Sequence, residues 1–145
     1  MSRGPILVGV GALSALVAVA LGAFGAHGLR GQLTPDLAAT FDTAARYQMY
    51  HALGLVAAGL WAERRPGAAV TAAGWLFLAG TLFFSGSLYL LALTGTRWLG
   101  AVAPVGGTAW IAGWGLLAVS ALRPGEPRAA SSAPPPRSPT GPPSP

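Results

Sequence analysis

Long apolar segments alternate with short polar connections through most of the chain. The segments cover approximately residues 6–26, 38–62, 69–93 and 101–122. Each is long enough to cross a hydrocarbon core of about 30 Å as a helix that rises about 1.5 Å per residue. The pattern predicts an all-α fold, an integral-membrane four-helix bundle formed by residues 1–123.

The second helix has the clearest boundary signals. Thr34-Pro35-Asp36 offers a capping hydroxyl, a proline at the first helical position and an acidic group in the first turn. These residue types favour a helix start. Glu63-Arg64-Arg65-Pro66-Gly67 is charged and breaks the helical pattern. The pattern therefore predicts a helix that is longer than one span, with its first turns at the membrane interface.

The first segment has two interpretations. A charged start at Arg3 and the alanine-rich end of the segment also occur in cleaved signal peptides. The apolar run is longer than the roughly 7–15 residues of such a leader, however. The segment also has a face of small residues, which lets helices approach closely in lipid and which a leader does not need. The predicted packing residues of this face are Gly11, Ala15, Ala18 and Gly22, and Gly54 of the second helix is predicted to pack in the same way.

Composition supports a membrane location. Charged residues make up 9% of the chain and hydrophobic residues 52%, whereas a soluble domain has roughly 25% charged residues. So few charges cannot cover the surface of a soluble protein of this size. The chain contains 0 cysteines, which excludes disulfides, thiolate nucleophiles, cysteine-ligated zinc and iron–sulfur clusters.

The positive charges are all arginines, and they indicate a topology. Four spans would place Arg3, Arg64, Arg65, Arg123, Arg128 and Arg137 on one side and Arg30, Arg46 and Arg97 on the other. The positive-inside rule then predicts that both termini are cytoplasmic. The arginines form no stripe with interleaved aromatic residues, so the pattern does not favour nucleic-acid binding.

Residues 124–145 differ from the rest of the chain. Prolines there alternate with serine, alanine and arginine. Such a segment cannot bury enough apolar surface to fold, so we expect a disordered, proline-rich tail. It is either a solvated appendage or a polyproline ligand.

Polar side chains run directly into the apolar part of the second helix. A helical projection groups Gly54 with a polar set on one face and places Met49, Leu53, Val56 and Leu60 opposite, towards lipid. Polar groups in lipid need partners, so the polar face is predicted to look into the bundle. The polar set is Arg46, Tyr47, Gln48, Tyr50 and His51.

Depth suggests partners on the third span. Counted from the outer end of each span, His51 lies about 12 Å deep, level with Ser85 and Ser87. We therefore expect His51 to pair with one of these serines. Tyr47 is predicted to lie near Tyr89. The cluster would act as helix-packing glue or form a ligand or transport site.

Asp42 precedes Arg46 by four residues. This is the favourable order for an ion pair on a helix.

Other chemistry is poorly supported. His27 and His51 lie at different depths, and no nearby acidic cluster or cysteine completes a metal or haem site. A Ser-His-Asp triad would need Asp36 or Asp42 to reach His51 from two turns or more away on the same helix. We expect no enzyme activity, no metal and no cofactor.

Four motifs in order resemble the YgdD-like family of small four-span membrane proteins, whose animal relatives are called transmembrane protein 256. The motifs are Gly22-Ala23-Phe24-Gly25-Ala26-His27-Gly28-Leu29, the segment from Phe41 to Leu53, Phe83-Phe84-Ser85-Gly86-Ser87-Leu88-Tyr89-Leu90-Leu91, and Ala103-Pro104-Val105-Gly106-Gly107. The resemblance covers about residues 5–122 and implies a bacterial inner-membrane protein. It implies no catalytic residue.

Two functions are consistent with these observations. The first is a non-enzymatic structural or interaction component of the membrane, whose partners are the lipid bilayer and either further copies of itself or another membrane protein. The second is an oligomeric transporter or channel for a small solute or ion that uses a polar cleft around the second helix.

Overall fold

The computed structural model describes residues 3–122, and within that range all regular secondary structure is helical. Helix α1 (Arg3–Ala23) continues into a π-helical turn, Phe24–Gly28, and α2 spans Pro35–Arg64. The third rod consists of α3 (Ala68–Gly80), a π-helical turn (Thr81–Ser85) and α4 (Gly86–Thr94). A 3₁₀ turn, Arg97–Ala101, leads into α5 (Ala103–Leu122).

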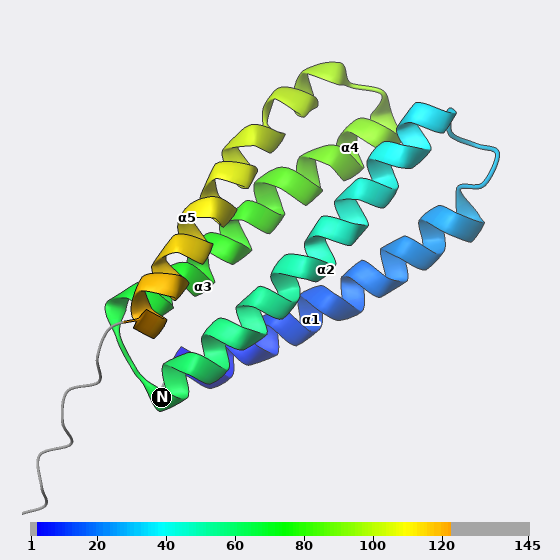
Figure 1. The fold of residues 1–145 in the computed structure, drawn as a ribbon. Coiled ribbons are helices and arrows are strands. Elements are labelled where there is room, and N and C mark those ends of the chain that lie inside the picture. The colour runs from blue at the N-terminus through cyan, green and yellow to red at the C-terminus, as the bar shows by residue number, and fades with distance from the viewer. Residues whose placement is uncertain (1–2, 123–145) are drawn as a thin grey trace, which may run out of the picture.

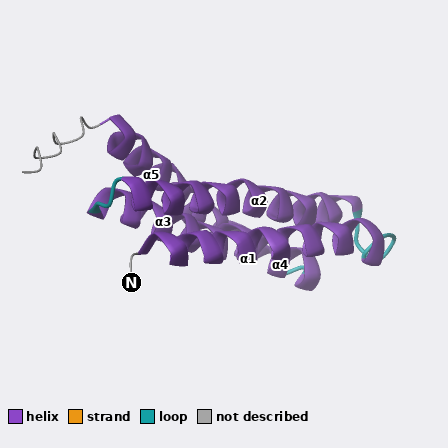
Figure 2. Ribbon diagram, turned by 90° about the horizontal axis from the view of Figure 1, so that it is seen from below, coloured by secondary structure: helices purple, strands orange, loops and turns teal. Residues whose placement is uncertain are grey.

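Four antiparallel rods form the bundle. Helix α2 and the α3–α4 rod lie in the middle, with α1 packed on α2 and α5 packed on α3 (Figure 1). Figure 2 shows the same bundle turned by 90°, with short loops at its two ends. The predicted all-α helical membrane bundle is confirmed. The predicted tail, residues 124–145, lies outside the described residues.

Three rods are long and apolar enough to cross a membrane: Arg3–Gly28, Ala68–Thr94 and Arg97–Leu122. Helix α2 does not meet that criterion within the described chain, because its polar stretch from Arg46 to His51 lowers its hydropathy. By length and composition, therefore, the described chain has three candidate spans.

Local sequence explains the helix ends. The Thr34 side chain accepts a hydrogen bond from the Leu37 N–H at 3.4 Å, and Pro35 is the first residue of α2. The predicted start of this helix is confirmed. At the end of α4, Gly95 has a φ of 71°, which a residue with a side chain rarely adopts. The chain can therefore turn sharply into α5.

Small residues spaced seven apart form the seam between α1 and α2. A Cβ added to Gly11 would meet the Ala52 carbonyl at 2.9 Å, and one added to Gly59 would meet the Gly4 carbonyl at 2.8 Å. Ala18 and Ala45 continue the same register and line one groove. A repeat of seven is typical of helices that stay in contact along their length. We call this set of contacts the α1/α2 seam.

A second seam of the same kind joins α3 to α5. A Cβ added to Gly106 would meet the Gly80 carbonyl at 2.7 Å, and one added to Gly113 would meet the Ala73 carbonyl at 3.3 Å. These positions are again seven residues apart on each helix. The bundle thus consists of two tightly paired antiparallel units.

Large apolar side chains fill the space between the two units. The central cluster contains Leu7, Leu55, Val70, Phe77 and Trp110, which are all at most 4% exposed. A smaller cluster contains Leu29, Phe41 and Ala92 and lies near the connection between α1 and α2. These clusters position the polar side chains of α2.

The close approach at Gly11 leads to a first prediction. Gly11→Ala should lower the free energy of unfolding by about 1–3 kcal/mol, because its methyl group has to push backbone apart. Gly9→Ala is the matched control on the same helix, where an added Cβ meets nothing within 4 Å. It should change stability by less than about 0.5 kcal/mol. Equal effects in an unfolding titration in detergent would contradict the seam.

Candidate functional site

Gln48 links three rods through its side-chain amide. Its Nε2 donates to the Ser14 carbonyl at 3.0 Å, and its Oε1 accepts from the Tyr89 hydroxyl at 2.9 Å. The side chain is buried, with the residue 6% exposed. Tyr89, which was expected near Tyr47, bonds to the next residue of α2, Gln48, and the Tyr47 ring packs on Phe84 and Trp110. The sequence pattern did not single out Ser14, whose backbone carbonyl is the nearer acceptor and whose hydroxyl oxygen lies 3.5 Å from the same amide nitrogen.

His51 is enclosed by aromatic rings and its own helix. Its Nδ1 forms a hydrogen bond with the Tyr47 carbonyl at 2.8 Å. Its ring is stacked on that of Trp110, with a centroid separation of 3.6 Å and an interplanar angle of 2°. The Trp110 indole N–H in turn donates to the Phe77 carbonyl at 3.2 Å. An indole face therefore covers the imidazole.

The predicted pairing of His51 with a serine is wrong. Ser87 Oγ donates to the Phe84 carbonyl at 3.0 Å within the α3–α4 rod. Ser85 is buried in the π-helical turn, and its hydroxyl has no partner among the described residues. Neither serine therefore forms a hydrogen bond with His51.

Arg46 and Tyr50 face outwards, which contradicts the prediction that the whole polar set looks into the bundle. The Arg46 side chain pairs with Asp42 as expected and is 59% exposed, and Tyr50 is 53% exposed. Tyr47 is 41% exposed and lies at the edge, where its ring packs on Phe84 and Trp110. Only Gln48 and His51 of the set are buried.

The predicted lipid face of α2 is only partly exposed. Leu53 and Leu60 are exposed, but Val56 contacts α1 beside Gly11 and Met49 lines a groove against α1. Helix α2 contacts both α1 and the α3–α4 rod. More than one face is therefore buried, and the exposed strip contains Arg46 and Tyr50.

The predicted packing residues lie in the helix contacts. Gly11 meets α2, and a Cβ on Gly22 would lie 3.9 Å from that of Ala45. Ala18 is buried and Ala15 half-buried. Gly54 faces aromatic rings instead, since its added Cβ would lie 3.1 Å from Trp114 and 3.4 Å from Phe77.

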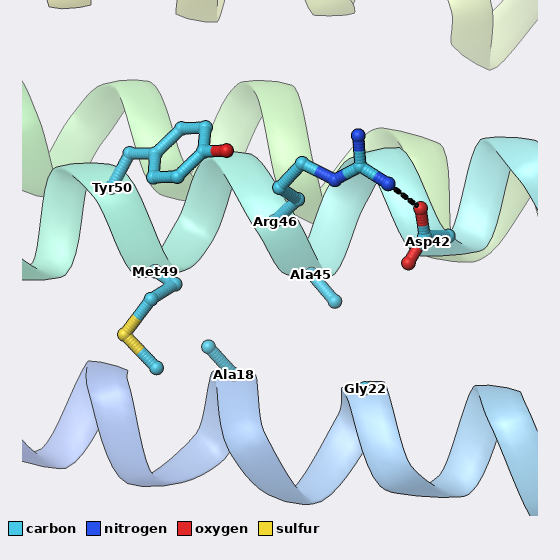
Figure 3. Close-up of a pocket in the computed structure, with 7 residues that line it drawn as sticks. All are labelled: Ala18, Gly22, Asp42, Ala45, Arg46, Met49 and Tyr50. Atoms are coloured by element: carbon cyan, nitrogen blue, oxygen red, sulfur yellow. Dashed lines mark hydrogen bonds and ion pairs between the residues drawn. The ribbon is translucent and has the colours of Figure 1, made fainter.

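A shallow groove of about 290 Å³ runs along the outer side of the α1/α2 seam. Figure 3 shows Arg46 directed along α2 towards Asp42, with Tyr50 beside it and Ala18 and Gly22 on the facing helix. Within residues 3–122, His, Asp and Glu side chains form no group of three that could hold a metal ion.

The comparisons with known proteins agree with this description. Residues 21–107 match the family described as "Protein of unknown function (DUF423)". The chain belongs to the DUF423 family. The expected membership of a membrane-protein family without an assigned activity is thereby confirmed.

Several relatives are named as membrane proteins. The chain is 45% identical over 119 residues to UPF0382 membrane protein YwdK of Bacillus subtilis. The aligned region covers 81% of this chain and 97% of the relative. It is 48% identical over 118 residues to UPF0382 membrane protein SERP0230 of Staphylococcus epidermidis, with 81% and 96% covered. No solved structure shows a significant match. The chain is thus a helical membrane protein of the DUF423 family.

The Gln48 bridge leads to a second prediction. In a double-mutant cycle, Gln48→Leu and Tyr89→Phe should show a coupling free energy of about 0.6 kcal/mol, and at most about 1.7 kcal/mol. The measurement is unfolding of the four proteins in one detergent. The control cycle pairs Gln48→Leu with Tyr50→Phe, whose exposed hydroxyl makes no bond to Gln48. Coupling as small in the first cycle as in the second would contradict the bridge.

Proposed function

We propose that this DUF423 protein is a non-enzymatic, multi-pass component of the bacterial cytoplasmic membrane. It acts through its outer surface on lipid or on neighbouring proteins. The observation that carries the proposal is the Gln48 bridge. Both ends of its amide bond to other rods, so this buried polar side chain of α2 serves helix packing.

The α1/α2 seam supports a membrane-spanning role for α2. Gly59 lies against Gly4 at one end of the seam, and Phe41 lies against Gly25 at the other. If α1 crosses the bilayer, α2 must lie beside it through the full depth. Its 30 residues correspond to about 45 Å of helix, more than the hydrocarbon thickness. This arrangement supports the proposal of four spans with both termini on one side.

Arginine placement supports cytoplasmic termini. The start of α1, the end of α2 and the end of α5 lie together at one end of the bundle (Figure 1). Arg3, Arg64 and Arg65 belong to this end, and Arg123, Arg128 and Arg137 follow α5 in the sequence, whereas Arg30, Arg46 and Arg97 belong to the other half. The positive-inside rule assigns the first end to the cytoplasm.

A C-terminal reporter that is active only outside the cytoplasm should therefore stay inactive.

The transport alternative finds less support. Its predicted cleft would require Arg46, Tyr47, Gln48 and His51 to line one space, but Arg46 is exposed while Gln48 and His51 are buried. Phe77, Leu55 and Trp110 fill the middle of the bundle. A path would have to form between copies of the protein, outside the individual bundle.

A flux measurement tests the proposed function. Proteoliposomes containing the purified protein should release K⁺, Cl⁻ or protons no faster than protein-free vesicles, because the bundle centre is packed with apolar side chains. His51→Ala should behave in the same way. Flux that requires the wild-type protein and falls in His51→Ala or Arg46→Gln would contradict the proposal and favour a transporter.

A further inference from the structure

Two depressions on the α1/α2 seam join into one groove. The first has a volume of about 290 Å³ and the second about 190 Å³, and they share Gly22 and Asp42. The floor of the joint groove contains Ala18, Gly22 and Ala45, and one rim carries Asp42, Arg46 and Tyr50. We call this surface the seam groove. It combines a smooth apolar floor with three polar side chains on one side.

Two of the three rim residues, Asp42 and Arg46, reach one edge of the hydrocarbon core, whereas Tyr50 lies about two turns deeper than Asp42. Helix α2 is about 15 Å longer than the core, so roughly 7 Å extends beyond each face if it is centred. Asp42 lies seven residues after Pro35, or about 10 Å along the helix. The Arg46 side chain reaches outwards to the same level (Figure 3). This is where lipid ester and headgroup atoms begin.

The rim retains unused hydrogen-bonding groups. The ion pair joins Arg46 Nη2 to Asp42 Oδ2. Among residues 3–122, Arg46 Nη1 and Nε, Asp42 Oδ1 and the Tyr50 hydroxyl make no hydrogen bond. The two charged side chains are 59% and 61% exposed. The pair satisfies one oxygen and one nitrogen, and polar groups of the lipid interface can bind the rest.

Charge complementarity identifies that partner. A phosphate diester accepts charge-assisted hydrogen bonds from a guanidinium and a phenol. A primary ammonium donates to a carboxylate. A headgroup that carries both groups matches Arg46 on one side and Asp42 on the other. A choline headgroup has no N–H donor, and a glycerol headgroup has no positive charge.

We propose that the seam groove binds an ethanolamine phospholipid, with its phosphate at Arg46, its ammonium group at Asp42 and an acyl chain along the small-residue floor and past Tyr50. The flexible Met49 side chain lines the deeper part of the groove and can adapt to a disordered chain. The inference rests on the part of the proposed function that places α2 in the bilayer, and it holds for either orientation.

Native mass spectrometry of the full-length protein tests the proposal. The protein in detergent is titrated with dioleoyl lipids that differ only in an ethanolamine, choline or glycerol headgroup, and with soluble phosphoethanolamine. The wild type should bind the ethanolamine lipid about fivefold more tightly than the choline lipid, as one exposed charge pair allows. Soluble phosphoethanolamine should not bind, because it lacks the acyl chain. Its binding as tightly as the lipid would overturn the assigned acyl-chain contact.

Two variants separate the contributions. Asp42→Asn should remove the preference for ethanolamine over choline, and Arg46→Gln should weaken all three phospholipids. Glu63→Gln and Arg97→Gln are matched controls, because both residues are exposed and lie away from the groove; both should bind as the wild type does. Thermal unfolding of each variant confirms that it is folded.

Several results would overturn the lipid site. They are equal binding of ethanolamine and choline lipids by the wild type, an unchanged preference in folded Asp42→Asn, or a dimer without lipid that disappears in both variants. The last result would assign the groove to a second copy of the chain. Ion flux together with a retained ethanolamine preference would instead contradict the proposed function and leave the lipid site intact.

Discussion

Close contact between backbones at small residues determines the rest of this bundle. Within lipid, apolar side chains do not drive helices together, so association depends on close packing and on hydrogen bonds. In α1 and α2, small residues recur every seven positions and place Gly11 against the Ala52 carbonyl. The same repeat brings Gly80 and Gly106 together between α3 and α5. These two seams fix how each helix is rotated about its axis.

That rotation decides which polar side chains become internal. With Ala52 turned towards α1, Gln48 points to the space between α1 and α4 and bonds to both. His51 turns towards α5 and stacks on Trp110. Arg46 and Tyr50 are left on the outer surface. One helix therefore supplies both the polar link inside the bundle and the charged rim outside it.

The sequence was sufficient for the helices but not for the pairing of their side chains. The cap at Thr34, the glycine-containing connections and the small-residue face of α1 are local signals, and each has a direct structural result. Which residue meets His51 depends on rotation about the helix axis. A π-helical turn at Thr81–Ser85 inserts an extra residue into the third rod, and one extra residue rotates the remainder of that rod by about 100°. The serines were predicted as partners from their depth alone, and depth does not show which way they face.

The orientation of Arg46 was mispredicted for a different reason. A single polar arc on a helix projection suggests one inward face, but α2 has neighbours on two sides. Its buried surface is consequently set by small residues such as Ala45, Ala52 and Gly59 as much as by polar ones. Composition cannot show which edge of a polar arc remains outside. The positions of neighbouring helices are needed for that.

Cysteine cross-linking tests the seam register most directly, because the chain contains 0 native cysteines. A Cβ on Gly22 would lie 3.9 Å from that of Ala45, within the roughly 3.5–4.5 Å that a disulfide requires. Gly22→Cys combined with Ala45→Cys should therefore form a disulfide in native membranes. Gly22→Cys combined with Ala52→Cys, one repeat further along, should not. Cross-linking of the second pair, or none in the first, would contradict the register on which this structure depends.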